Sequence, residues 1–138
     1  MNKIHIDFTT IREDFNEYEA ENGQILRVKL VLVDIVTDST DKSKFELNIK
    51  DISHVITRNE FDTSTMEFAK PDQVTKKDVV KELKFFPTKS VTNIYETKQS
   101  IIIIVLKVNS VNLTNKKDET NNPILRFTSE AKINIIVK

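Results

Sequence analysis

The chain has 138 residues, of which 38% are hydrophobic and 30% are charged, as in an ordinary globular protein. Its 21 basic and 21 acidic residues give a formal net charge of +0, so no long-range field attracts it to nucleic acid or to anionic lipid. The absence of cysteine excludes disulfides, thiol catalysis and thiolate metal sites.

The length suits one domain that spans residues 1–138. The opening stretch, MNKIHIDFTT, lacks an apolar block of the length that a secretory signal needs. The most apolar run covers only Ile101 to Leu106, far short of the roughly 20 residues of a membrane helix. We therefore expect a cytoplasmic protein that makes no membrane contact.

The first segment alternates apolar and polar residues at Ile4, Ile6 and Phe8, which predicts a short half-buried strand. Thr10 is followed three residues later by Glu13, a spacing that is typical of a capped helical turn.

Residues 15–57 have the pattern of a three-stranded meander. Its predicted parts are a strand from Phe15 to Ala20, a turn at Asn22-Gly23, a long strand from Ile25 to Val36, a polar loop from Thr37 to Lys44 and a third strand from Phe45. The apolar positions after Ile49 fall out of phase, which indicates a bulge near Lys50-Asp51. Val31, Val33 and Ile35 predict that the far half of the long strand is covered on both faces.

The connection, residues 58–90, carries the best helix signal. Thr75 is a suitable N-cap, with Asp78 at the third helical position, and Pro87 ends the pattern. An apolar stripe is formed by Val79, Val80, Leu83 and Phe86. These features predict a helix near residues 75–84, after a short strand at Met66 to Phe68.

Residues 91–138 repeat the plan of the first meander. The predicted parts are a strand from Val91 to Thr97, a turn at Lys98 to Ser100, a long strand from Ile101 to Leu113, a polar loop from Thr114 to Asn122 and a strand from Ile124 onward.

The two meanders align when one residue is removed from the first turn. Asn16, Tyr18 and Glu19 then match Asn93, Tyr95 and Glu96, and Leu26, Val28, Leu30 and Leu32 match Ile102, Ile104, Leu106 and Val108. A true duplication of 15–57 and 91–138 is one explanation, and the general likeness of amphipathic hairpins is the other. Either way, we expect a mainly β protein, an antiparallel β-sandwich or small barrel, with one short helix in the connection.

Catalytic signatures are missing. A single glycine does not suffice for phosphate-binding loops, and His5 and His54 lie in no metal-ligand spacing and beside no nucleophile. Asp34, Asp38 and Asp41 surround a loop and are better explained as solvated turn residues than as cation ligands. We expect no enzyme activity, no catalytic residues, no cofactor and no metal.

The Tyr-Glu pair is the one polar signature that occurs twice, as Tyr18-Glu19 and Tyr95-Glu96. Successive side chains of a strand point to opposite faces, so the two members of a pair do not line one pocket. The repeat is therefore better explained as a building unit than as a ligand site, and no binding residues are assigned.

The main functional hypothesis is a binding or assembly module that associates with itself. The alignment puts Arg27 and Lys29 opposite Ile103 and Val105, so the outer face of the second long strand is apolar where that of the first is charged. Ile101, Ile103 and Val105 need a cover, either the predicted helix or a second subunit. We expect a homo-oligomer that buries this face.

The alternative hypothesis is a protein that binds single-stranded nucleic acid. The order strand, Asn-Gly turn, long bent strand, polar loop, strand is similar to that of Sm-like and oligonucleotide-binding small barrels. The resemblance implies a basic surface with stacking aromatic residues, for which Arg27, Lys29 and Tyr18 are the candidates. The zero net charge and the absence of tryptophan disfavour this function.

Overall fold

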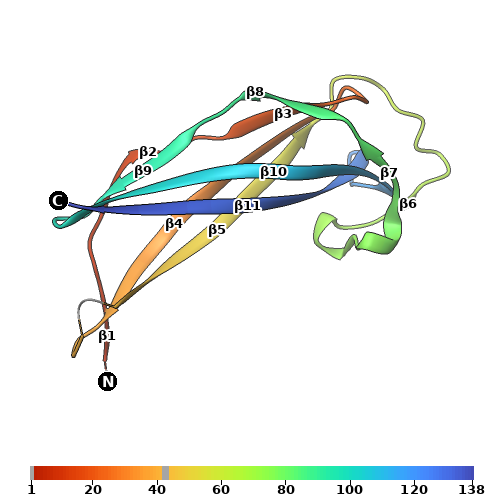
Figure 1. Cartoon of the computed structure of the whole chain (residues 1–138). Helices are drawn as coiled ribbons and strands as arrows, with labels where there is room; N and C mark the ends of the chain where they lie inside the picture. The colour runs from red at the N-terminus through yellow and green to blue at the C-terminus, as the bar shows by residue number, and fades with distance from the viewer. Residues whose placement is uncertain (1, 42–43) are drawn as a thin grey trace.

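The computed structural model describes residues 2–41 and 44–138 and shows a mainly antiparallel β-sandwich, with two sheets packed face to face (Figure 1). The strands are β1 (Lys3–His5), β2 (Thr9–Arg12), β3 (Asn16–Ala20), β4 (Ile25–Asp38), β5 (Phe45–Ile56), β6 (Glu67–Phe68), β7 (Val79–Leu83), β8 (Phe85–Lys89), β9 (Thr92–Glu96), β10 (Ser100–Lys117) and β11 (Pro123–Val137). Two 3-10 turns, η1 (Pro71–Gln73) and η2 (Lys76–Asp78), lie in the connection. The sandwich form confirms the first of the two predicted architectures.

Each sheet is built around one long strand. In the first sheet β5 follows one side of β4, while β3 and β1 share the other side and β8 pairs with β3. In the second sheet β11 follows one side of β10, while β9, β7 and β6 share the other side and β2 pairs with β9. The layers separate toward the end of the molecule where both termini lie (Figure 1).

The core lies between the sheets because alternate residues of the long strands point inward. Its buried members are Tyr18, Ala20, Leu26, Val28, Leu30, Leu32, Ile35, Leu83, Tyr95, Ile102, Ile104, Leu106, Val108, Val111 and Leu125. Both halves of the chain contribute to this one cluster. None of the helical segments among the described residues is both long enough and apolar enough to cross a membrane.

A bulge interrupts each long strand at the same place. The register of β4 with β5 shifts between Leu32 and Asp34, and that of β10 with β11 shifts between Val108 and Ser110. The bulge near Lys50-Asp51 was therefore predicted on the wrong strand. The observed bulge changes the phase of β4, so that Ile35 is buried while Val33 is exposed. The prediction that both faces of this half-strand are covered is therefore wrong at Val33.

The predicted helix at 75–84 is wrong. The capping box of Thr75 and Asp78 does form, but it closes only the 3-10 turn η2, and the chain then extends as β7. Leu83 pairs with Val111 of β10 and is 3% exposed, whereas Phe86 is 56% exposed. Cross-strand pairing with β10 outweighs the local helix signal, to which the β-branched Val79 and Val80 contribute weakly.

Other boundaries differ by less. Of the residues expected to form a helical turn at Thr10 to Glu13, the first three instead lie in β2, which pairs with β9, and Glu13 follows the strand. The second long strand continues to Lys117, so the loop after it is shorter than predicted. Residues 42 and 43 of the predicted loop at Thr37 to Lys44 lie outside the described residues.

The two halves match in register through every strand of both units. Tyr18 pairs with Leu26 as Tyr95 pairs with Ile102, and the third strands follow the same pattern. The likeness starts earlier than the sequence predicted, because Ile4 pairs with Thr37 of β4 as Lys81 pairs with Leu113 of β10. The matching segments are thus 4–56 and 81–136.

The second strand of each half belongs to the opposite sheet. Arg12, Thr10 and Thr9 of β2 pair with Ile94, Tyr95 and Glu96 of β9. Lys89, Pro87 and Phe86 of β8 pair with Glu17, Tyr18 and Glu19 of β3 in the same way. The halves therefore exchange one strand reciprocally.

Candidate functional site

The repeated Asn-x-Tyr motif lies inside the sandwich and joins its two layers. Asn16 Oδ1 accepts a hydrogen bond from Val91 N (2.7 Å), and Asn93 Oδ1 accepts one from Asp14 N (3.1 Å). Tyr18 contacts Phe85 edge-on with a centroid distance of 6.0 Å, and Tyr95 contacts Phe8 likewise at 5.8 Å. These reciprocal contacts fit a building unit.

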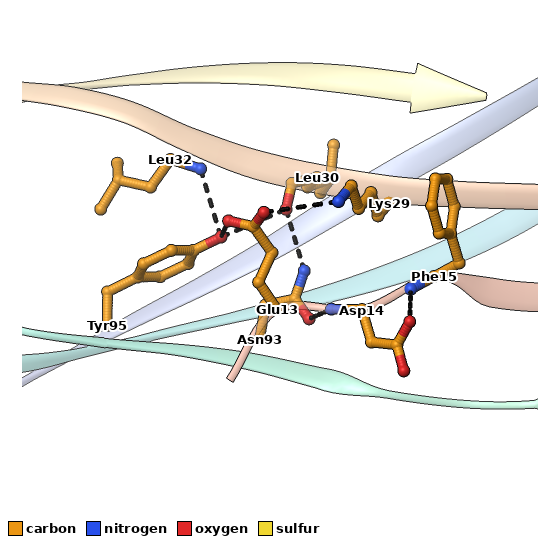
Figure 2. Close-up of polar contacts among 8 residues, drawn as sticks. All are labelled: Glu13, Asp14, Phe15, Lys29, Leu30, Leu32, Asn93 and Tyr95. Carbon is orange, nitrogen blue, oxygen red and sulfur yellow. Dashed lines mark hydrogen bonds and ion pairs between the residues drawn. The ribbon is translucent and has the colours of Figure 1, made fainter. Parts of the chain in front are cut away.

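One extra carboxylate makes the second tyrosine different (Figure 2). Tyr95 Oη donates to Glu13 Oε2 at 2.6 Å and accepts from Leu32 N at 3.3 Å, and Asn93 Nδ2 donates to Leu30 O at 2.9 Å. Burial, together with the hydrogen bond to Glu13, raises the pKa of Tyr95. Tyr95 is thus a neutral donor at physiological pH and has no free position for a substrate.

The outer face of β4 carries a cluster of charged residues around one ring. Arg27 Cζ lies 4.3 Å and Lys29 Nζ 4.8 Å from the centroid of Phe15. Each cation has an acidic partner, since Arg27 Nε lies 3.1 Å from Glu17 Oε1 and Lys29 Nζ lies 3.5 Å from Glu13 Oε1. The cluster is therefore locally neutralised.

Tyr18 is not part of this cluster. Its side chain is buried between the sheets, and burial raises its pKa. The structure therefore brings Arg27 and Lys29 together, as the nucleic-acid hypothesis needs, but places the proposed stacking residue in the core. Phe15 takes the position beside the cations, and its ring is also in edge contact with His54 at 5.5 Å.

The corresponding outer face of the second sheet has an apolar centre, bordered by Thr92, Glu96, Lys132 and Asn134. We call it the isoleucine face and define it as Ile94, Ile101, Ile103, Val105 and Ile136. Ile101 pairs with Ile136, and Ile103 pairs with Ile94, so these side chains are neighbours on one surface. Val105 is 36% and Ile136 50% exposed, whereas Ile94, Ile101 and Ile103 are half-buried. The segment predicted to cover this face as a helix instead pairs, as β7, with β10 from Val111 to Thr114.

A hollow of about 340 Å³ opens between the sheets at the end near β1. Its floor includes the buried Ile35 and Ile102, and its rim includes His5, Asp7 and Lys98. The lining is mixed, and its apolar floor is continuous with the core, so the hollow has room for a side chain or a small apolar group.

The other predicted positions have structural explanations. His5 Nδ1 lies 4.0 Å from Asp34 Oδ2, and Asp38 Oδ1 accepts hydrogen bonds from both N and Oγ1 of Thr40. Asp41 Oδ2 lies 3.9 Å from Lys44 Nζ. No group of three or more metal-ligating side chains gathers within residues 2–41 and 44–138.

Glu13 and Phe15 were not singled out from the sequence. Glu13 was interpreted as part of a helical turn and Phe15 as an ordinary strand residue, because neither belongs to a repeated motif. One signal was available in the sequence. Glu13 and Phe15 have the same strand phase as Glu17, which pairs with Arg27, so an extended chain places all three on the face of Arg27 and Lys29.

The fold defines a two-layer β protein with charged and apolar outer faces in equivalent positions. Comparisons of the chain with protein-family models, curated proteins and solved structures found no match.

Proposed function

We propose that the protein is a non-enzymatic assembly module of the cytoplasm that associates with itself through the isoleucine face. The observation that carries this proposal is the contrast between equivalent surfaces, since Ile103 and Val105 stand where Arg27 and Lys29 stand in the other half. An apolar, strand-forming surface of this kind is typical of an interface.

A second copy is the partner that the composition favours. The formal net charge is +0 and the sequence pI is about 6.7, so copies do not repel each other near neutral pH. The connecting segment was the other candidate to cover the isoleucine face. Its strand β7 pairs instead with Val111 to Thr114, at the end of β10 away from Ile101 and Ile103. Pairing two isoleucine faces about a two-fold axis would give each copy an identical apolar cover.

The internal repeat belongs to the same proposal. We propose that the chain contains two copies of one unit, each needing the other because Tyr18 and Tyr95 pack on strands from the opposite half. In this arrangement one outer face stays charged and faces water, and the other is specialised for contact between molecules.

The test is the solution mass of two lysine variants. Ile103→Lys places charge within the isoleucine face, while Ile52→Lys makes the same change at an exposed position on the outer face of the first sheet. Light scattering should show that Ile103→Lys has a lower mass than the parent and that Ile52→Lys keeps the mass of the parent. A folded Ile103→Lys variant that keeps the full mass of the parent would contradict the proposal.

A further inference from the structure

Strand β11 is a long edge strand with an unused side. One side pairs with β10 along nearly its whole length, and no strand among the described residues pairs with the other side. Near its start this side is close to other groups, since Pro123 O accepts a hydrogen bond from Gln24 Nε2. From Arg126 onward it is open, and the strand there contains no proline that would block pairing.

The open part of β11 also leaves apolar side chains in water. Ile133 and Ile135 point toward the interior side of the sheet, because they pair with the buried Ile104 and Ile102, yet they are 41% and 40% exposed. A sheet that ends here leaves both its backbone groups and these side chains uncovered. A further strand would cover both.

We propose that this further strand is β11 of a second copy, paired antiparallel about a two-fold axis at Ala131. In this register Glu130 of each copy lies opposite Lys132 of the other, so two opposite-charge pairs form. On the inner side Ser129 meets Ile133, and Phe127 meets Ile135. The pairing joins the second sheets of two molecules into one continuous sheet.

The charges select this register over its neighbours. Glu130 and Lys132 make no ion pair within the described part of the chain, and Lys107, the residue of β10 opposite Glu130, does not come within ion-pair distance of it. A shift of the axis to Ser129 brings Lys132 against Arg126, which is repulsive. A shift to Ile133 leaves Glu130 opposite Ile136 and Lys132 opposite Asn134.

The equivalent edge strand of the other half does not fit a second copy in this way. Asp51 of β5 pairs with Leu30 as Ala131 of β11 pairs with Leu106, so Asp51 stands where Ala131 stands. A β5 edge paired with itself about this position would put two carboxylates face to face at the axis. The open edge of β11 is thus the one suited to self-pairing.

The inference deepens the proposed function and depends on it for one premise, that copies of the chain associate. The two contacts use different surfaces, because the isoleucine face is the outer side of the sheet and the pairing uses its edge. Lys132 lies opposite Val105 of the isoleucine face and Glu130 lies opposite Lys107 outside it, so Glu130→Lys is the variant that removes the edge contact selectively.

Charge reversal tests the pairing in the full chain. Glu130→Lys and Lys132→Glu each create two like-charge pairs and should raise the dissociation constant of the edge contact about tenfold or more, whereas the double reversal should restore it. Both positions are exposed, so circular dichroism should show an unchanged fold. Single reversals without effect, or a double reversal that does not restore association, would overturn the pairing.

Engineered cysteines test the register directly, since the chain has no cysteine of its own. Ala131→Cys puts two thiols at the axis and should give a disulfide-linked dimer under mild oxidation, while Ser129→Cys separates them by four residues and should not. Linkage through Ser129→Cys alone, or through neither, would overturn the register.

Three outcomes separate this inference from the proposed function. A parent that is monomeric at all concentrations contradicts both. The two contacts together predict a lower mass than that of the parent for both Ile103→Lys and Glu130→Lys. A mass that falls in Ile103→Lys but not in Glu130→Lys contradicts the edge pairing and supports the isoleucine face. A mass that falls in Glu130→Lys but not in Ile103→Lys contradicts the isoleucine face and supports the edge pairing.

Discussion

Asn16 and Asn93 each accept a hydrogen bond from the backbone two residues before the other. Val91 N donates to Asn16 at 2.7 Å, and Asp14 N donates to Asn93 at 3.1 Å. Both side chains are buried, so these bonds are shielded from water and hold the crossing segments between the sheets. The two halves are thus fastened by one contact used twice.

The asparagines should be important for stability to different degrees. Asn93→Ala removes the acceptor of Asp14 N and the shorter of the two side-chain hydrogen bonds to Leu30 O, which keeps Tyr95 Oη at 3.4 Å, while Asn16→Ala removes only the acceptor of Val91 N. We expect Asn93→Ala to lower the free energy of unfolding by about 1–3 kcal/mol and Asn16→Ala to lower it by less. Urea denaturation measures both. The exposed Asn134→Ala is the control and should change stability by less than about 0.5 kcal/mol.

Tyr95→Phe should destabilise more than Tyr18→Phe. The hydroxyl of Tyr95 donates a hydrogen bond to Glu13 and accepts one from the backbone N of Leu32. The hydroxyl of Tyr18 contacts the backbone of Val108 and has no carboxylate partner. Loss of the Tyr95 hydroxyl should lower the free energy of unfolding by about 1–3 kcal/mol. Equal losses of unfolding free energy in the two variants would show that the hydrogen bond to Glu13 does not stabilise the fold.

The parent protein and Tyr95→Phe also give a pH test. Burial, with the hydrogen bond to Glu13, raises the pKa of Tyr95 in the folded protein, so its phenol stays neutral where the unfolded phenol ionises. The stabilisation is complete below the unfolded pKa of about 10 and declines above it. The stability advantage of the parent over Tyr95→Phe should therefore shrink as the pH rises above about 10. A constant difference would contradict the assigned environment.

Leu83 and Phe86 distinguish a strand from a helix in the connection. A helix would place both on one apolar stripe, but the structure buries Leu83 and exposes Phe86. Leu83→Ala should lower the free energy of unfolding by about 2–5 kcal/mol, and Phe86→Ala should change it far less. Thermal unfolding of both variants is sufficient. Comparable losses would favour the helix.

Binding to single-stranded DNA or RNA should be weak and should show little salt dependence. Glu17 and Glu13 already pair with Arg27 and Lys29, and the buried Tyr18 does not present its ring to a base. Fluorescence anisotropy at several salt concentrations measures this. Micromolar binding that weakens steeply with salt and is lost in Arg27→Glu with Lys29→Glu would instead favour nucleic-acid binding.

Most strands could be predicted from the sequence because apolar and polar residues alternate along them, as they do in β4 and β10 up to the bulge of each strand. The error at 75–84 arose because Thr75 and Asp78 form a real capping box, and local signals do not reveal that β10 has an open edge beside Leu83. The alignment, extended backward by the same spacing, matches Ile6 with Leu83 and Phe8 with Phe85. The alignment therefore predicted a strand at Leu83, which the capping signal at Thr75 and Asp78 led us to assign to a helix.

The surfaces were harder to predict than the core. The contrast between Lys29 and Val105 was visible in the aligned sequence, because facing positions follow from strand period. The cluster around Phe15 was not, because it depends on cross-strand contacts of Phe15 with Arg27, Lys29 and His54. The exchange of β2 and β8 was not visible either, because it pairs segments of opposite halves of the chain, which no local pattern encodes.

Self-association is the central claim, and the solution mass of the unmodified chain tests it most directly. Light scattering across a dilution series should give a multiple of 16.0 kDa that falls toward 16.0 kDa on dilution. A stable, soluble species of 16.0 kDa at every concentration would show that the isoleucine face needs no partner and would contradict the account.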